Sequence, residues 1–206
     1  MELFSLLSSL PYLKLYETPY YTFAEFLELC SMRISGVQMA LLEQLSILPG
    51  CKKNGNITGK DYDAEYADFQ NRIRKSLPER ALIRKYAEWE MALRNSLAKI
   101  RASKWNRTEN SLRENIAYEA DTERIAQAAY TAANPLERER ILDEARWDKL
   151  DELTRINHCH SFTFDAVCAY GLKLQLAEKW VRRSGEAAMA NLNKAAELVQ
   201  QPSVQQ

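Results

Sequence analysis

The sequence predicts an all-α fold, an elongated bundle of about seven helices, from its few turn residues and its repeated helix-start motifs. Glycine and proline are scarce, with six of each among 206 residues, about half their usual frequency. No glycine occurs between Lys60 and Tyr170, where only Pro78 and Pro135 interrupt the chain. Because a β-rich chain needs turn residues every ~8–12 positions, long helices are expected instead.

Helix starts are marked by capping boxes, in which a Ser or Thr hydroxyl and a Glu or Gln side chain satisfy early backbone N–H groups. The motif begins at Thr22, Ser35, Ser76 and Ser111. Asn134 before Pro135 marks a further start, and Ser161 or Thr163 marks another. The expected helices cover residues 22–31, 35–48, 61–76, 77–104, 111–132, 135–156 and 163–199.

Apolar side chains in the segment 77–104 recur every three or four residues, which is the α-helical period. They are Leu82, Tyr86, Trp89, Leu93, Leu97 and Ile100. The helix 163–199 begins almost entirely apolar, so most of its circumference must be covered and it is expected at the centre of the bundle. Trp89 and Trp180 are expected in the core.

A single helical domain over residues 1–206 is expected, because a chain of this length buries roughly 70% of its unfolded surface. The polar, glycine-rich loop 49–60 is the best candidate for a mobile loop or a subdomain boundary. The N-terminus lacks the basic region and cleavage site of a signal peptide, and no stretch approaches the ~20 apolar residues of a membrane span. Four scattered cysteines indicate reduced thiols. A cytoplasmic protein is therefore expected.

Charge is balanced over the chain, with 28 basic and 28 acidic residues, but the segment 71–107 has eleven basic and three acidic residues. In one interpretation this segment lies beside acidic helices of the same bundle. In the other it presents a basic face to an acidic protein or to anionic headgroups. The exposed partner-binding candidates are then Arg84, Lys85, Arg101 and Lys104. Nucleic acid is not an expected partner, because the chain has no recognition motif.

No catalytic, cofactor-binding or metal site is predicted. The lack of glycine-rich loops excludes the common nucleotide-binding motifs. The cluster His158–His160 has metal-ligand chemistry but no fourth ligand nearby, so a connector whose histidines bond to the backbone is the preferred interpretation. The acids in 143–152 alternate with Arg146 and Lys149 and are interpreted as a solvated face.

Three segments carry a family resemblance: SLLSSLPYLKL followed by Thr22–Cys30, then Trp89–Leu97, and then Tyr170–Trp180. Together they resemble a small bacterial family of unassigned biochemistry that is encoded among the genes of V/A-type ATP synthases. Trp89–Leu97 is also similar, more loosely, to the W-E-[IL]-x-N-[IL] helices of the C subunit of V/A-type ATPases, whose eukaryotic counterpart is the d subunit.

The resemblance implies an all-helical, non-enzymatic protein in the position of the C subunit, the socket between the central shaft of the ATPase head and the membrane rotor ring. It implies those two assemblies as partners, a role in ion transport, and a cytoplasmic location peripheral to the membrane. A stand-alone helical protein-binding module, such as a regulator or assembly factor, is the alternative. A helical metalloenzyme using His158 and His160 is a third and more distant interpretation.

The residues that carry the resemblance are interpreted first as architecture. Lys173 lies on a helix so apolar that its ammonium group needs a partner. We therefore expect a polar network between helices. Its members are Glu90, Arg94, Asn95 and Lys173.

Overall fold

The structure is a computed structural model, and it describes residues 2–45, 68, 71–73, 75, 77, 81–104, 120–156 and 162–183. Helix is the main regular structure in these ranges, and no strand occurs within them, so the predicted all-α class is confirmed. The helices are α1 (Glu2–Ser9), α2 (Phe23–Ser31), α3 (Gly36–Gln44), α5 (Leu82–Lys104), α6 (Ala120–Thr131), α7 (Pro135–Ile156) and α8 (Phe164–Val181).

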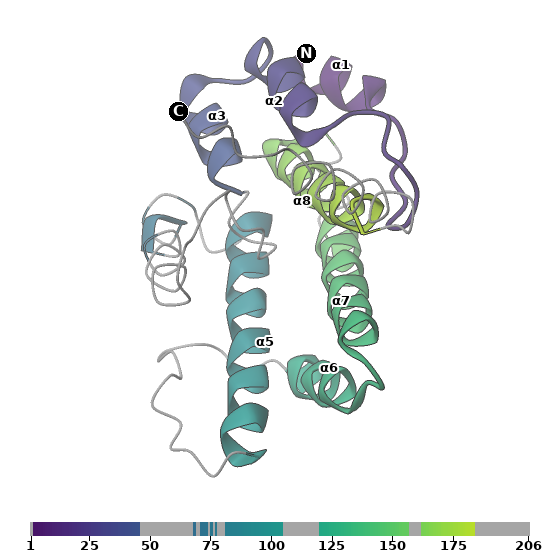
Figure 1. Cartoon of the computed structure of the whole chain (residues 1–206). Coiled ribbons are helices and arrows are strands. Elements are labelled where there is room, and N and C mark those ends of the chain that lie inside the picture. The colour runs from purple at the N-terminus through teal and green to yellow at the C-terminus, as the bar shows by residue number, and fades with distance from the viewer. Residues whose placement is uncertain are drawn as a thin grey trace, which may run out of the picture.

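The helices form an elongated bundle with two ends (Figure 1). The long helices α5 and α7 run side by side, and α6 packs against both of them at one end. Helices α1, α2 and α3 gather at the other end, around α8. Because α8 contacts α1, α2, α3, α5 and α7, the prediction of a central last helix is confirmed.

Local capping explains where several helices begin. Thr22 and Ser35 each form the predicted capping box, and Thr22 N donates to Glu25 Oε2 at 2.7 Å. Asn134 Oδ1 accepts from Glu137 N at 2.8 Å, as expected for the residue before Pro135. The capping motifs at 76 and 111 lie outside the described residues. At these three helices the sequence motif therefore locates the helix start.

Helix α5 begins at Leu82 rather than at the predicted position 77. Leu82 N donates to Asp165 Oδ2 of α8 at 3.3 Å, so the carboxylate that satisfies this helix N-terminus comes from another helix. A carboxylate at a helix N-terminus also complements the positive end of the helix dipole. Among the described residues, the side chain that bonds the start of α5 thus comes through a tertiary contact.

Both chain ends depart from the expected helix boundaries. Helix α1 is not among the predicted helices, although Leu3, Leu6, Leu7 and Leu10 have helical spacing before Pro11. Helix α8 ends at Val181 with Arg182 as its C-cap, whereas the predicted helix continues to 199; residues after 183 lie outside the described ranges. Within 61–76, residues 68, 71–73 and 75 are helical. The loop 49–60 is likewise not described.

The core is built around α5 and α8. Five of the six predicted apolar positions of α5 are buried, namely Leu82, Tyr86, Trp89, Leu93 and Leu97, while Ile100 is half-buried. Trp180 is half-buried at the edge of the core rather than inside it. No described helix is long and apolar enough to cross a membrane.

The connection between α1 and α2 is fastened to α7 and α8 by side chains. Tyr16 Oη donates to Glu144 Oε1 at 2.7 Å, and the Tyr16 ring meets the Trp180 ring edge-on at 5.3 Å. Tyr170 Oη donates to the Pro11 carbonyl at 3.1 Å. Together these contacts hold an irregular segment against the bundle.

Two of the cysteines are buried free thiols, Cys30 on α2 and Cys168 on α8. Burial raises the pKa of Cys30 to about 12 and holds the pKa of Cys168 well above its ordinary value. Both side chains therefore act as small apolar groups in the core. Cys51 and Cys159 lie outside the described residues.

Gly171 offers a test of how closely α8 packs on its neighbours. A Cβ at this position would lie 3.0 Å from Phe26 Cε1 and 3.6 Å from Leu42 Cδ1. We expect Gly171→Val to lower the free energy of unfolding by about 1–3 kcal/mol through overpacking, measured by urea denaturation. Gly36→Ala is the matched control, because nothing lies within 4 Å of its added Cβ, and it should raise stability by about 0.4–1 kcal/mol. An unchanged Gly171→Val midpoint would contradict the close packing.

Candidate functional site

The most distinctive polar feature of the described residues is a buried salt bridge between α5 and α7. Glu90 of α5 is fully buried. Arg146 of α7 donates two hydrogen bonds to the Glu90 carboxylate, from Nε to Oε2 at 3.0 Å and from Nη2 to Oε1 at 3.0 Å. Arg94 Nε adds a third bond to Oε1 at 2.9 Å. Such bidentate arginine–carboxylate pairs are stronger than neutral hydrogen bonds, and they fix the relative orientation of the two side chains.

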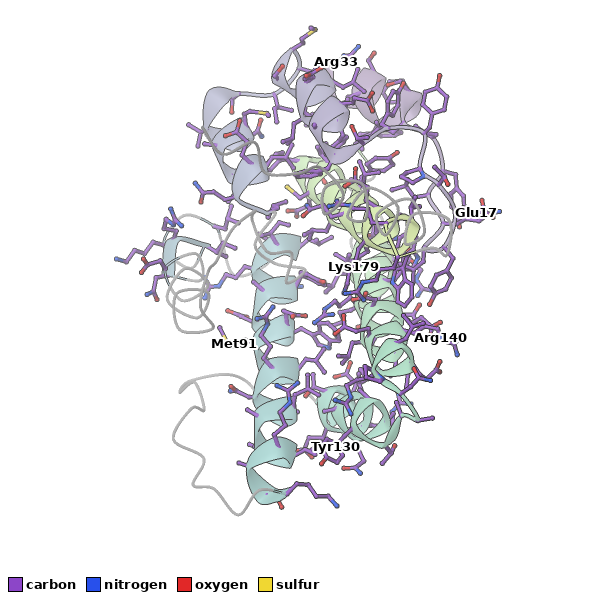
Figure 2. The ribbon with its side chains drawn as sticks, in the orientation of Figure 1. Glu17, Arg33, Met91, Tyr130, Arg140 and Lys179 are labelled. Carbon is purple, nitrogen blue, oxygen red and sulfur yellow. The ribbon has the colours of Figure 1, made fainter. Side chains whose placement is uncertain are left out.

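The same arginine links α7 to α8 through Asp143, which is also fully buried. Arg146 Nη1 donates to Asp143 Oδ1 at 2.8 Å. The other carboxylate oxygen, Oδ2, accepts from Trp180 Nε1 at 3.1 Å and lies 2.7 Å from Lys179 Nζ. Figure 2 shows Lys179 where α8 passes α7. We call this set the ion-pair network: Glu90, Arg94, Asp143, Arg146, Lys179 and Trp180.

At its outer edge the ion-pair network reaches solvent. Lys179 Nζ donates to Glu139 Oε2 at 2.8 Å, and Arg183 Nη1 approaches the same oxygen at 3.4 Å. The side chains of Glu139 and Arg183 are 38% and 40% exposed. A continuous series of ion pairs therefore connects the buried face of α5 with the surface of α7 and the end of α8.

The electrostatics keep these groups charged. Burial alone raises the pKa of Glu90, but the guanidinium groups of Arg146 and Arg94 outweigh it and hold that pKa below its usual value. Burial likewise lowers the pKa of Arg146, yet Glu90 and Asp143 raise it well above the ordinary value. For Glu139, burial raises the pKa, but Lys179 outweighs burial and holds that pKa below its usual value. The carboxylates of Glu90 and Glu139 are thus ionised in the folded protein at neutral pH.

This arrangement holds three helices in one register. If α5 slid along α7, Glu90 and Arg146 would separate and leave buried charges without partners, which is far costlier than losing an apolar contact. Apolar packing alone is less directional, because it depends mainly on area. The network is therefore suited to a mechanical role in which the helices move together.

The structure brings together two of the four predicted network residues, Glu90 and Arg94. Lys173 is also partnered, but through Asp151 of α7 and the ring of Trp147, 4.9 Å from its Nζ. Asn95 is half-buried next to Arg94 on α5. The expectation that Lys173 needs a partner on a neighbouring helix therefore agrees with the geometry.

The interpretation of the 143–152 acids as a solvated face is wrong at Asp143 and at the interleaved Arg146, both of which are buried. A signal was present in the sequence. Arg146 stands four residues after Leu142 and four before Leu150, both of which are buried. Because residues four apart share a helix face, Arg146 belongs to the apolar stripe of α7.

A second polar link joins α5 to α6. Trp89 Nε1 donates to Asp121 Oδ2 at 3.0 Å, and the hydroxyls of Ser96 and Thr122 lie 3.1 Å apart. Trp89 is only 1% exposed, and Lys149 of α7 lies 6.0 Å from its ring centroid. Trp89 therefore lies where α5, α6 and α7 meet.

The four partner-binding candidates do not form one patch. Arg84 is half-buried, bonded to Glu88 at 3.2 Å and to the Leu77 carbonyl at 3.4 Å, so its predicted exposure is wrong. Lys85 is half-buried as well. Arg101 and Lys104 are exposed in the last turn of α5, about 25–30 Å along the helix axis from Arg84 at ~1.5 Å per residue.

The candidate metal ligands at 158–160 lie outside the described residues. Within the described ranges, no group of three or more His, Cys, Asp or Glu residues is placed to hold a metal ion. The candidate site that the described residues do show is the ion-pair network, whose bonded side chains position helices against one another.

Comparison with known proteins finds a similarity to one uncharacterised family. Residues 111–194 match the model of a family described as a protein of unknown function, DUF2764. The matched range contains α6, α7 and α8, and with them the network residues of α7 and α8, whereas Glu90 and Arg94 precede it. No curated protein and no solved structure matches the chain. The similarity to this family thus covers the part of the network that lies on α7 and α8.

Proposed function

We propose that this protein is a non-catalytic central-stalk component of a V/A-type rotary ATPase or ATP synthase, in a position like that of the C subunit. It couples the shaft of the ATPase head to the membrane rotor ring during ion transport. The proposal starts from the resemblance of three segments of the sequence. The structural observation that supports it best is the ion-pair network that joins α5, α7 and α8.

A protein that transmits torque must resist shear between its own helices. The network supplies that resistance through bonds of fixed geometry between helices: Arg146 of α7 holds Glu90 of α5, and Asp143 of α7 holds Lys179 and Trp180 of α8. An elongated bundle also has two well-separated ends (Figure 1). These properties suit a piece that is held by one partner at each end. A cytoplasmic position beside the membrane is part of the proposal.

Co-purification tests the proposed function directly. The tagged chain is expressed from its own locus, membranes are dissolved in mild detergent, and the recovered proteins are identified and quantified. Head and rotor subunits in fixed proportion to the tagged chain are the expected result. Recovery of the chain without these subunits would contradict the proposal, and defined recovery with another protein would support the alternative, a stand-alone regulator or assembly factor.

The exposed cations at the end of α5 provide a sharper test of partner binding. We expect the double variant Arg101→Glu, Lys104→Glu to weaken association with the ATPase subunits, because it reverses two charges on an exposed helix end. A circular dichroism melt checks that the double variant stays folded, because the change also removes two cations from the negative end of the α5 dipole. Association is measured by quantitative co-purification at two salt concentrations.

Lys14→Glu is the matched control, because Lys14 is an exposed lysine that pairs with Glu17 far from α5 in the sequence. It should leave association unchanged. Equal recovery of ATPase subunits with the double variant and with the control would show that Arg101 and Lys104 are solvated surface residues.

A further inference from the structure

Helices α1, α2 and α3 gather at one end of the molecule (Figure 1), and large apolar side chains on and beside them remain exposed. Phe4 of α1 is 56% exposed, and Phe162, just before α8, is 48% exposed. Their ring centroids lie 4.5 Å apart. Met32, which follows α2, and Val37, in the first turn of α3, are each 84% exposed. The exposed pair of Phe4 and Phe162 rings marks a candidate interaction surface.

A groove of about 940 Å³ opens beside the two phenylalanine rings. Its apolar lining consists of Leu3, Phe4, Ile34 and Phe162. The volume is near the upper end of the range for ligand sites, ~300–1,000 Å³. It therefore accommodates several side chains of a partner more readily than one small metabolite.

One charged side chain, Arg33, lines this groove among the described residues, and Figure 2 shows it at the α1–α3 end. Arg33 Nη1 donates to the Leu29 carbonyl at 3.3 Å, and no described acid lies within ion-pair distance of it. A guanidinium has five N–H donors, so most of them remain for a ligand. The other polar lining residues, Ser35 and Gln38, bond to each other in the capping box of α3.

We propose that this groove binds an amphipathic helix of a partner protein, which presents aliphatic side chains to Phe4 and Phe162 and a carboxylate to Arg33. Charge complementarity favours this partner. Arg33 lacks an acidic neighbour among the described residues and lies beside the apolar lining of the groove. Its guanidinium can therefore bind a carboxylate of the partner in a bidentate pair. Aliphatic residues three or four positions apart on a helix would cover the rings.

Two other occupants fit the groove less well. A second copy of this chain, docked through the same face, meets lining residues that include no acid among those described, so Arg33 would stay unpaired. A membrane is disfavoured because a single cation is too few to hold a protein at an anionic surface. The proposal does not depend on the rotary ATPase, since it concerns the chemistry of the groove alone.

Selection from a displayed peptide library tests the proposal. Amphipathic helical peptides with one randomised face are selected on the full-length chain, with counter-selection on the Phe4→Asp variant. The enriched peptides should share aliphatic residues at helical spacing and one Asp or Glu. Replacing that acid by Lys in the best peptide should raise its Kd at least about tenfold, measured by fluorescence anisotropy.

The reciprocal change is Arg33→Glu. This variant should no longer bind the selected acidic peptide, and it should bind the version of that peptide in which the acid is replaced by Lys. Lys14→Glu is the control for a charge reversal elsewhere and should change neither Kd. If melting shows that Arg33→Glu loosens α2, Arg33→Gln gives the same test through loss of the acidic peptide alone. No enrichment, enriched peptides without an acid, or equal Kd values for Arg33→Glu and the unmodified chain would overturn the proposal.

Two measurements address the other occupants. Sedimentation over a concentration series detects self-association, and flotation with vesicles of phosphatidylcholine and phosphatidylglycerol detects membrane binding. Either one, if abolished by Phe4→Asp, would overturn the proposal in favour of a second copy or a bilayer. Because these assays use the isolated chain, their outcome is independent of ATPase co-purification.

Discussion

Arg146→Ala is expected to lower the free energy of unfolding by about 3–5 kcal/mol, because it leaves two fully buried carboxylates without their shared partner. Glu90 would keep only Arg94, and Asp143 would keep Trp180 and Lys179. Urea denaturation followed by circular dichroism at pH 7 measures the loss. Arg140→Ala is the control on the same helix, since Arg140 pairs at the surface with Glu137, and it should leave stability nearly unchanged.

A second substitution separates buried charge from lost packing. Adding Glu90→Gln to Arg146→Ala should recover part of the lost stability, because the charge that lost its main partner is removed. If the stability losses of Glu90→Gln and Arg146→Ala instead add, the effect of Arg146→Ala comes from lost packing of its side chain. The charge pair would then do little to fix the position of α5 against α7.

The same pair has a defined pH dependence. The pKa of Glu90 is held below its usual value in the folded protein, so this group stabilises the fold above its unfolded pKa of about 4.3. That contribution is lost as the pH falls through the folded pKa. In Arg146→Ala, only Arg94 remains to oppose the increase that burial causes in the pKa of Glu90. Glu90 should therefore take up a proton at a higher pH than in the unmodified protein.

The stability difference between the unmodified protein and Arg146→Ala should therefore be largest at pH 7 and shrink on acidification toward about pH 4. Denaturant titrations at a series of pH values measure it. A difference that is the same at every pH would show that the charge state of Glu90 does not contribute.

Trp89→Ala is expected to have an effect of similar size, about 3–5 kcal/mol, since it removes a buried aromatic side chain where α5, α6 and α7 meet. The Trp89 ring also stacks near Tyr86, with centroids 6.0 Å apart. Trp89→Phe should have a smaller effect, about 1–3 kcal/mol, because most of the apolar volume stays while Asp121 Oδ2 loses its indole donor.

Far-UV circular dichroism is the appropriate probe for these variants, because the substitution itself changes tryptophan fluorescence. Tyr12→Ala is the matched aromatic control, since Tyr12 is 88% exposed and its removal should hardly shift the midpoint. Equal effects of Trp89→Phe and Trp89→Ala would indicate that the bond to Asp121, rather than the packing of the ring, stabilises this junction.

Helix α7 illustrates what sequence patterns predict well. Its observed range, Pro135–Ile156, coincides with the expected one, because Asn134 and Pro135 define its start within the chain itself. The start of α5 illustrates the limit, since Leu82 N donates to Asp165, more than eighty positions away on α8. Local motifs predict a helix start correctly when both partners are neighbours in sequence.

The candidate site divides in the same way. Glu90 and Arg94 are both members of the predicted polar network, and they bond to each other one turn apart on a single helix. Asp143 and Arg146 are interpreted from the sequence as solvated, because a charged helix face and a buried charged stripe have the same composition. The spacing of Arg146 from Leu142 and Leu150 indicates that it lies on the buried face of α7. That spacing predicts a buried ion pair only once Glu90 is known to face Arg146.

By itself, the sequence determined the all-α class, the start of each described helix that carries its own cap, and the apolar face of α5. Only the tertiary structure decided which charges are buried, which helix supplies the carboxylate that bonds Leu82 N, and where Arg33 meets an apolar groove. The physical reason is one of range: helix period and capping depend on residues within one or two turns. The ionisation and burial of a side chain depend on groups that other helices bring to it.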